Sequence, residues 1–295
     1  MKIFDCFMYF DEEMILDLRL NILNKYVDNF VIVESIYNHK GEKRELKFNP
    51  KKFRNFKDKI IYLIYEEIPS EVESISGNEL ADEKSGKLIM NALHRESGQR
   101  NFIMNGLKNA NSEDIILISD VDEIPNLENI IFDKIKKKII FFNQDMLYYK
   151  FNLKLPNLTW TGTRGCKKKY LKSPQWIRNI KDRKYPFYRL DALFSEKKFI
   201  SCEIIKNGGW HFTNIKTAIE IQHKLRSYLH HIEFDKNPLT IDKINEIIKN
   251  KKAIYDLTAD KRQDKFEGGK LENYPLEKLP KFLIDNLNNY KQWMD

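Results

Sequence analysis

The stretch DIILISDVDEIP, residues 114–125, decides the fold of this chain. Its first six residues, 114–119, form a short apolar run, which is typical of a central strand in a parallel sheet. Three acids follow at once, and the proline two residues after the last acid predicts that the strand ends there. We therefore expect a buried strand that delivers Asp120, Asp122 and Glu123 to the edge of an open sheet, where ligands bind in α/β proteins.

Further runs of strand length lie around this segment, at residues 2–9, 29–34, 59–65 and 138–142. Between them, apolar residues recur at helical spacing after Asp11, which we expect to cap the first helix, and across residues 86–110. Residues 126–135 are also interpreted as a helix. This order predicts the fold class α/β, with an open, mostly parallel sheet flanked by helices and joined by right-handed crossovers.

The second half has a different character. Residues 148–165 are aromatic and rich in turn residues, and GGWHF at 208–212 predicts a tight turn into a strand. Three helices are expected near the C-terminus, at residues 215–231, 241–252 and 276–293. Because the chain contains no internal repeat and no low-complexity linker, residues 1–295 are interpreted as one domain.

Composition excludes several classes of protein. The 295 residues are 42% hydrophobic, so disorder is excluded, and three cysteines are too few for a disulfide scaffold. No run approaches the roughly 20 apolar residues of a membrane span, and the N-terminus does not resemble a signal peptide. We therefore expect a soluble protein of the cytoplasm or an equivalent reducing compartment. The net charge of +8 is interpreted as a solvated lysine-rich surface that also suits an anionic ligand.

The acid pair carries the chemistry. In extended chain, residues i and i+2 point the same way, so Asp120 and Asp122 are expected to present two carboxylates on one side. Such carboxylates repel each other unless a cation lies between them. Mg²⁺ and Mn²⁺ commonly combine one or two carboxylates with substrate phosphates, so the motif predicts a metal held against a diphosphate. The alternative is that the acids only cap a turn or the next helix.

Several segments together resemble glycosyltransferase family 17. In chain order they are IFDCFMYFDEE and LRL (3–20), FVIVES (30–35), FRNFKDKIIYL (53–63), ESGQRNFIMNGL (96–107), SDVDEIP (119–125), GGWHF (208–212) followed by Lys224, and LPKFLIDNLNNY (279–290). The resemblance implies a GT-A-type fold with a Rossmann-like nucleotide-sugar-binding half, residues 1–145, and an acceptor half, residues 146–295. It also implies a UDP-sugar donor, UDP-GlcNAc, a glycan acceptor, a divalent metal at the DxD motif and inversion at the anomeric carbon. No nucleic-acid partner is expected.

The resemblance also implies roles for residues at the metal. Asp122 is expected to ligate the ion directly, and Asp120 to hold the ribose or the ion through water. His211 resembles the late histidine that many GT-A enzymes add as a ligand, and a neutral imidazole favours Mn²⁺ over Mg²⁺. The alternative for His211 is a core histidine between two aromatic residues.

Four charged residues are candidates for binding the nucleotide. Glu34 and Glu13 are placed at the uridine or ribose, although a solvated acid at a strand end and a charge in the first turn of a helix are the alternatives. Arg100 and Lys224 are expected to neutralise phosphate oxygens, the arginine in a bidentate manner and the lysine as a point charge. Either cation is alternatively an ordinary surface residue.

Inversion requires one general base near the acceptor hydroxyl. The sequence leaves four candidates open: Glu123, Asp145, Asp191 and Glu203. The aromatic residues Tyr148, Tyr149, Trp160 and Trp176 are either platforms for acceptor sugar rings or simply core. Two rival functions use the same acids: a metal-dependent phosphohydrolase of nucleotide-type substrates, and a non-catalytic protein that binds sugar or nucleic acid. The first lacks a phosphoaspartyl nucleophile motif.

Overall fold

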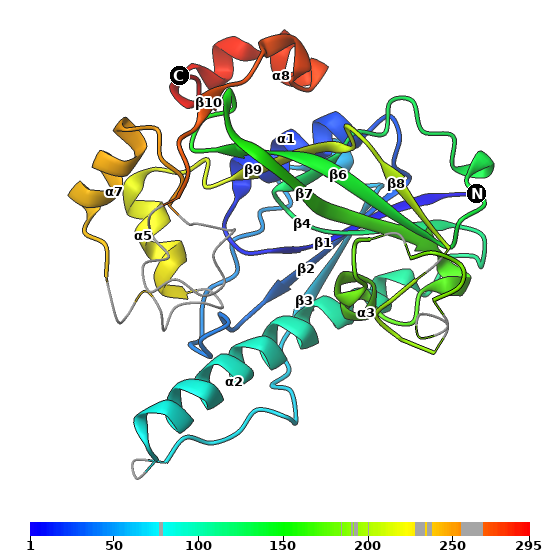
Figure 1. Ribbon diagram of the computed structural model, residues 1–295, viewed down its shortest axis with the longest axis horizontal. Helices are drawn as coiled ribbons and strands as arrows, with labels where there is room; N and C mark the ends of the chain where they lie inside the picture. The colour runs from blue at the N-terminus through cyan, green and yellow to red at the C-terminus, as the bar shows by residue number, and fades with distance from the viewer. Residues whose placement is uncertain are drawn as a thin grey trace.

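Strands from both halves of the chain join in one mixed sheet with helices on its two faces, as the computed structural model shows (Figure 1). The structure describes residues 1–76, 79–183, 185–189, 191, 194–199, 201–227, 234, 238–254 and 268–295. The strands in these residues are β1 (Ile3–Tyr9), β2 (Asn29–Ser35), β3 (Ile60–Tyr65), β4 (Ile115–Asp120), β5 (Glu123–Pro125), β6 (Ile139–Tyr148), β7 (Leu153–Lys167), β8 (Cys202–Ile205), β9 (Gly209–Thr213) and β10 (Glu272–Asn273).

The helices surround this sheet. The α-helices within the described residues are α1 (Glu13–Leu23), α2 (Ala81–Asn101), α3 (Pro174–Asn179), α5 (Ala218–Ser227), α7 (Ile241–Lys249) and α8 (Lys281–Asp285). The short 3-10 helices are η1 (Arg54–Phe56), η2 (Phe102–Leu107), η3 (Phe132–Lys134), η4 (Lys168–Tyr170), η5 (Leu276–Lys278) and η6 (Leu287–Trp293).

The first half forms the predicted parallel arrangement. Strands β3, β2, β1 and β4 lie in this order and all run parallel, so their carboxyl ends meet at one edge. The register pairs Tyr9 of β1 with Glu34 of β2, and Met8 of β1 with Asp120 of β4. The acid motif therefore lies directly beside the ends of the first two strands.

The expectation of a mostly parallel sheet is wrong, because the second half adds antiparallel strands. The expected turn-rich segment, residues 148–165, is largely the 15-residue strand β7, which runs antiparallel to both β4 and β6. Aromatic and β-branched side chains favour such a strand. Gly162 lies within it and leaves room for the side chain of Gln144 on β6. Strand β5 is likewise antiparallel to β9.

Three further local expectations differ from the structure. Residues 126–135 contain only the three-residue η3 instead of a helix. The apolar strand β4 already ends at Asp120, and Pro125 is the last residue of the short strand β5 at one end of the sheet order, where a missing N–H is tolerated. In addition, Glu12 rather than Asp11 occupies the N-cap position of α1.

The expected C-terminal helices appear in shorter pieces. The segment at 215–231 contains α5, with positions 228–231 lying outside the described residues, and 241–252 contains α7. The final segment, 276–293, divides into η5, α8 and η6. The helix expected over residues 86–110 is confirmed as α2 followed by η2.

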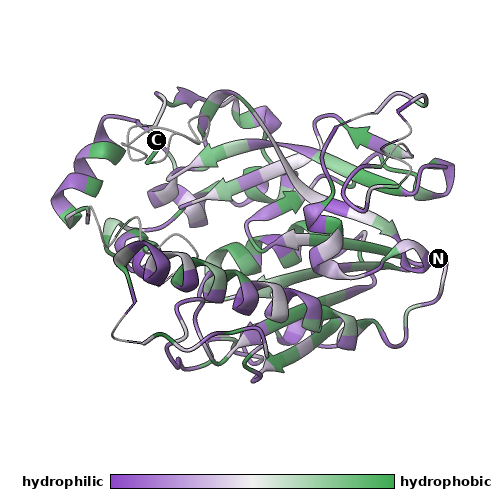
Figure 2. Ribbon diagram, turned by 60° about the horizontal axis from the view of Figure 1, so that its bottom comes forward, coloured by the Kyte–Doolittle hydropathy of each residue, from purple (hydrophilic) through white to green (hydrophobic). Residues whose placement is uncertain are grey.

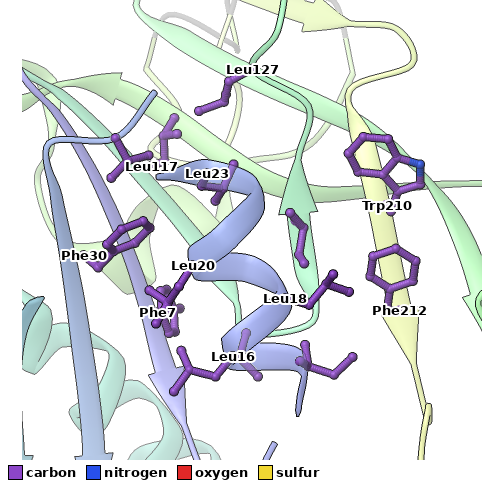
Figure 3. Close-up of a cluster of buried hydrophobic side chains, with 14 of the residues drawn as sticks. Phe7, Leu16, Leu18, Leu20, Leu23, Phe30, Leu117, Leu127, Trp210 and Phe212 are labelled. Carbon is purple, nitrogen blue, oxygen red and sulfur yellow. The ribbon is translucent and has the colours of Figure 1, made fainter. Parts of the chain in front are cut away.

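Alternate residues of the parallel strands build the core on the two faces of the sheet. Phe7 and Phe30 pack with the apolar side of α1, as Figure 3 shows for a cluster that also holds Leu16, Leu20 and Leu117. Their neighbours along the strands, such as Cys6 and Val31, face η2 and α3 on the other side. The central strands are accordingly hydrophobic along most of their length, whereas the outer helices carry hydrophilic residues (Figure 2).

Two features of the structure concern the disulfide scaffold and the membrane span considered in the sequence. The three cysteines, Cys6, Cys166 and Cys202, are all buried and are not joined by disulfide bonds. Among the described residues, no helix has the length and apolarity that crossing a membrane would require.

Candidate functional site

A cavity of about 470 Å³ opens at the carboxyl edge of the parallel strands. It receives the ends of β1, β2 and β4 from the first half and side chains of β6, β7, β9 and α5 from the second. The charged residues that line it are Glu12, His39, Arg44, Glu96, Arg100, Asp120, Asp122, His211 and Lys224. The cavity thus places ionisable groups of both signs on a largely apolar wall that includes Tyr9, Tyr148 and Trp160.

A buried arginine beneath the cavity shapes the acid motif. Arg19 of α1 donates hydrogen bonds to the backbone carbonyls of Asp120, Val121 and Glu123, at 3.1, 3.1 and 2.8 Å. Its other nitrogens hold the carboxylate of Asp5 and the hydroxyl of Ser119. Because β4 ends at Asp120 and β5 begins at Glu123, these bonds fix the turn between the two strands.

The two aspartates of this turn both line the cavity, but their carboxylates have different partners. Asp120 follows Ile116 and Ile118 on the face of β4 that is covered by α2 and α3, as strand alternation requires. Asp122 lies beyond the strand end, where the alternation no longer holds, and its side chain has different partners. The two carboxylates are therefore neighbours that are neutralised separately.

Two arginines hold Asp120. Its Oδ1 atom lies 3.1 Å from Nη2 of Arg100, and its Oδ2 atom lies 3.0 Å from Nη2 of Arg178. Burial by itself would raise the pKa of Asp120, but the charges of Arg178 and Arg100 outweigh burial and hold it below its ordinary value. Arg100 also contacts Glu96 at 2.7 Å. Its Nε atom is buried without a hydrogen-bond partner.

His211 and Lys224 surround Asp122. Nε2 of His211 lies 3.5 Å from Oδ1 of Asp122, and Nζ of Lys224 lies 3.7 Å from Oδ2. Burial alone would raise the pKa of Asp122, yet these two cationic partners lower it; conversely, Asp122 raises the pKa of His211 against the effect of burial. The Nδ1 atom of His211 is buried without a hydrogen-bond partner.

Glu123 is enclosed behind the cavity. Its side chain is fully buried, and its oxygens accept hydrogen bonds from Nε1 of Trp160 at 2.7 Å, from Arg178 and from the backbone N–H of Asp120. The antiparallel pairing of β5 with β9 places it directly opposite His211. With both oxygens occupied and no part in the cavity lining, Glu123 is arranged to fix its neighbours in place.

Comparison with known proteins decides the family. The model of glycosyltransferase family 17 matches residues 1–294. The chain belongs to glycosyltransferase family 17. It is a glycosyltransferase. The similar proteins carry the name beta-1,4-mannosyl-glycoprotein 4-beta-N-acetylglucosaminyltransferase. Those of Homo sapiens and Rattus norvegicus are 26% identical to this chain over 186 residues, and that of Mus musculus is 25% identical over 186 residues. The match covers 60% of this chain and 32% of each relative, so the chain spans about a third of their length.

The two glutamates expected at the nucleotide lie outside the cavity lining of this family 17 enzyme. Glu34 is fully buried and accepts hydrogen bonds from the backbone of Lys47 and Phe48 and from the hydroxyl of Tyr62, so it fastens the loop that follows β2. Glu13 is exposed and paired with Lys52 at 2.6 Å.

The other three base candidates lie outside the cavity lining, and the side chains of two of them are paired. Asp145 contacts Lys154 at 2.5 Å and the hydroxyl of Tyr274 at 2.7 Å, outside the cavity lining. Asp191 is paired with Arg189 and Lys198 on the surface. Glu203 lies in β8, where it pairs with β6.

The four expected sugar platforms of the family 17 enzyme separate into two groups. Tyr148 and Trp160 line the cavity, and the ring of Trp160 lies 5.2 Å from that of His211. Tyr149 is buried in the core, and the indole of Trp176 donates to the backbone carbonyl of Glu196.

The structure also assembles residues that the sequence analysis did not select. Arg178, Glu96, Gln99 and His39 all lie at or behind the cavity, brought there by α2, α3 and the loop after β2. The pair Ser173–Pro174 is a helix-start signal, and the hydroxyl of Ser173 does cap α3. That signal predicts the helix, but nothing in it indicates that Arg178 reaches an acid 58 positions away.

Asp122 and His211 are the pair at this site that could hold a divalent ion. Across the described residues, no group of three His, Cys, Asp or Glu side chains is placed to hold a metal. Asp122 and His211 do converge, and the unpartnered Nδ1 shows that the ring is not tied into the core by hydrogen bonds. Two protein ligands suffice where diphosphate oxygens and water complete the shell, so this pair fits such an ion, whereas Asp120 is engaged by arginines.

Proposed function

We propose that this family 17 enzyme transfers GlcNAc from UDP-GlcNAc to a hydroxyl of a glycan, with inversion, on a GT-A-type fold. The main observation in support of this proposal is that Asp122, His211 and Lys224 lie together on the wall of a cavity at the carboxyl edge of parallel strands. That edge is where α/β sheets bind nucleotides. The names of the similar proteins support the choice of sugar.

We propose Asp122 and His211 as the residues that hold Mn²⁺ or Mg²⁺ in this enzyme. When bound, such an ion supplies positive charge against the diphosphate oxygens of the donor. The carboxylate matches the preference of both ions for oxygen, and the imidazole favours Mn²⁺. Asp120 is assigned to the ribose, or to the ion through water, because its carboxylate is shared between Arg100 and Arg178.

The cations of the cavity wall act on the leaving group. Transfer breaks the bond between the anomeric carbon and the diphosphate, so negative charge develops on UDP. We assign Lys224 and Arg100, which both line the cavity, to stabilise that charge as it develops, which lowers the barrier instead of merely tightening binding.

The acceptor hydroxyl attacks from the opposite face and gives its proton to a carboxylate. Besides the two aspartates, Glu12 and Glu96 are the carboxylates on the cavity wall among the described residues, and we place the base with them. The flat faces of Trp160 and Tyr148 suit the CH faces of a pyranose ring.

Calorimetry with UDP tests this proposal. UDP is expected to bind in the presence of Mn²⁺ and to lose most of its affinity when EDTA is added, because the diphosphate is then held by protein cations alone. Hydrolysis of UDP-GlcNAc, UDP-Gal, UDP-Glc and GDP-Man in the absence of acceptor then identifies the donor. Failure to bind or hydrolyse any of these compounds contradicts the proposal.

A further inference from the structure

The short helix α3 carries an arginine that contacts two acids of the motif, the buried Glu123 and the partly exposed Asp120. Arg178 donates to Oε2 and Oε1 of Glu123 at 2.7 and 3.0 Å, and to Oδ2 of Asp120 at 3.0 Å. It also donates to the carbonyl of Gly162 on β7 at 2.6 Å. The Arg178 side chain is only 12% exposed and is absent from the cavity lining. Its guanidinium is therefore used entirely within the protein.

Two other contacts keep α3 in its place. Arg164 of β7 donates to the carbonyls of Ile177, Arg178 and Ile180, which lie at and just beyond the C-terminal end of this helix. At the opposite end, the side chain of Gln175 accepts a hydrogen bond from Arg100. The helix is thus fastened to β7 and α2, so the position of Arg178 is not free to drift.

We propose that Arg178 is a positioning residue that, with Glu123 as its anchor, holds the carboxylate of Asp120 in the orientation needed for donor binding. This inference rests on the proposed function, since it concerns the same cavity. Asp120 lies at the end of a strand, and its side chain is 38% exposed. Without Arg178, Arg100 would be the one side chain among the described residues left to restrain it, and its carboxylate would turn toward solvent.

The chemistry of arginine suits this task. A planar guanidinium donates from several nitrogens in a fixed fork, so one side chain fixes two carboxylates relative to each other. Glu123 needs such a partner because an unpaired carboxylate in a dry interior is strongly disfavoured. Lysine at this position keeps the charge but lacks the fork, which makes Arg178→Lys an informative variant.

A double-mutant cycle on UDP affinity tests the inference. Wild type, Arg178→Lys, Asp120→Asn and the double variant are compared by calorimetry in the presence of Mn²⁺. If Arg178 acts through Asp120, Arg178→Lys weakens UDP binding by roughly tenfold or more in the wild-type background. It then changes affinity by less than about twofold once Asp120 is already altered. Equal losses in both backgrounds overturn the inference, and so does a lowered melting temperature with unchanged UDP affinity.

Two controls guard against simple unfolding. Arg54→Met removes an exposed arginine outside the cavity lining and is expected to leave UDP affinity unchanged. The variant Arg178→Met/Glu123→Gln removes the arginine together with the charge that it neutralises, so no uncompensated carboxylate is left inside.

A crystal structure of Arg178→Met/Glu123→Gln separates this inference from the proposed function. We expect the Asp120 carboxylate to leave the position that it occupies beside Arg178. A carboxylate that stays in place overturns the inference, whether or not the wild type binds nucleotides. If wild type binds no nucleotide sugar while Asp120 moves as expected, only the proposed function fails.

Discussion

Arg19 and Asp5 form a fully buried, bidentate ion pair, with nitrogen–oxygen distances of 2.7 and 2.6 Å. The pair joins α1 to β1, and the remaining nitrogen of the guanidinium donates to the three carbonyls of the turn that carries Asp122. A contact within the first twenty residues therefore supports a functional turn a hundred positions later. The shape of the site depends on this buried charge pair.

Replacing Arg19 with methionine is expected to destabilise the fold strongly. The change leaves the Asp5 carboxylate buried without a partner and frees three carbonyls, and breaking a buried pair in this way costs about 3–5 kcal/mol. Urea unfolding measures the loss. The double variant Asp5→Asn/Arg19→Met removes both charges and should recover part of the stability. A loss below about 1 kcal/mol for Arg19→Met would contradict this account.

Asp122→Asn is expected to lower donor hydrolysis by at least about 100-fold while the fold survives, because the amide is a poor metal ligand and carries no charge for His211 and Lys224. Steady-state hydrolysis of UDP-GlcNAc measures the effect. Asp58→Asn, on an exposed acid outside the cavity lining, is the matched control. Unchanged turnover in Asp122→Asn would refute the role assigned to this residue.

Gly162→Ala is expected to disturb both stability and activity. A Cβ atom there would lie 1.8 Å from Oε1 of the buried Gln144 and 3.1 Å from Cδ of Glu123, so the neighbours of Asp120 would have to move. We expect overpacking of this kind to lower the free energy of unfolding by roughly 1–3 kcal/mol.

Gly86→Ala is the matched control for that substitution. Gly86 lies within α2, and a Cβ atom there meets nothing within 4 Å. The change should stabilise the protein by about 0.5–1 kcal/mol because alanine favours the helix. Thermal unfolding and donor hydrolysis of the two variants give the comparison, and similar behaviour of both would show that the space around Gly162 is not restrictive.

The surroundings of Asp120 predict a dependence of stability on acid. Its pKa lies below the ordinary value of 3.8 because Arg178 and Arg100 outweigh burial. A carboxyl group with a lowered pKa stabilises the fold above its unfolded-state pKa, and this contribution is lost as the pH falls through the folded-state pKa. The unfolding free energy of wild type minus that of Asp120→Asn should therefore be greatest near neutral pH and shrink below about pH 4. Urea titrations at several pH values test this, and a constant difference would argue against the paired carboxylate.

The sequence by itself determined the parallel half of the sheet and the acid motif at its edge. A short, continuously apolar run such as residues 115–118 is typical of a strand that is buried on both faces of a sheet. Because the acids follow this run directly, they lie at the edge of the sheet. Family membership followed from the same stretches, because their order along the chain is itself specific.

Tertiary structure decided the rest. The long strand β7 could not be predicted from the sequence, because Pro156 and Gly162 within it are typical of turns. Pairing with β4 and β6 stabilises this segment as a strand. Arg19 holds the backbone of the turn that carries Asp122, and the different partners of Asp120 and Asp122, such as Arg178 and His211, lie far away in sequence. A local sequence pattern shows which residues are acids and predicts where a strand ends. Which basic side chain pairs with each acid depends on long-range packing, so the local spacing of residues does not predict the pairing.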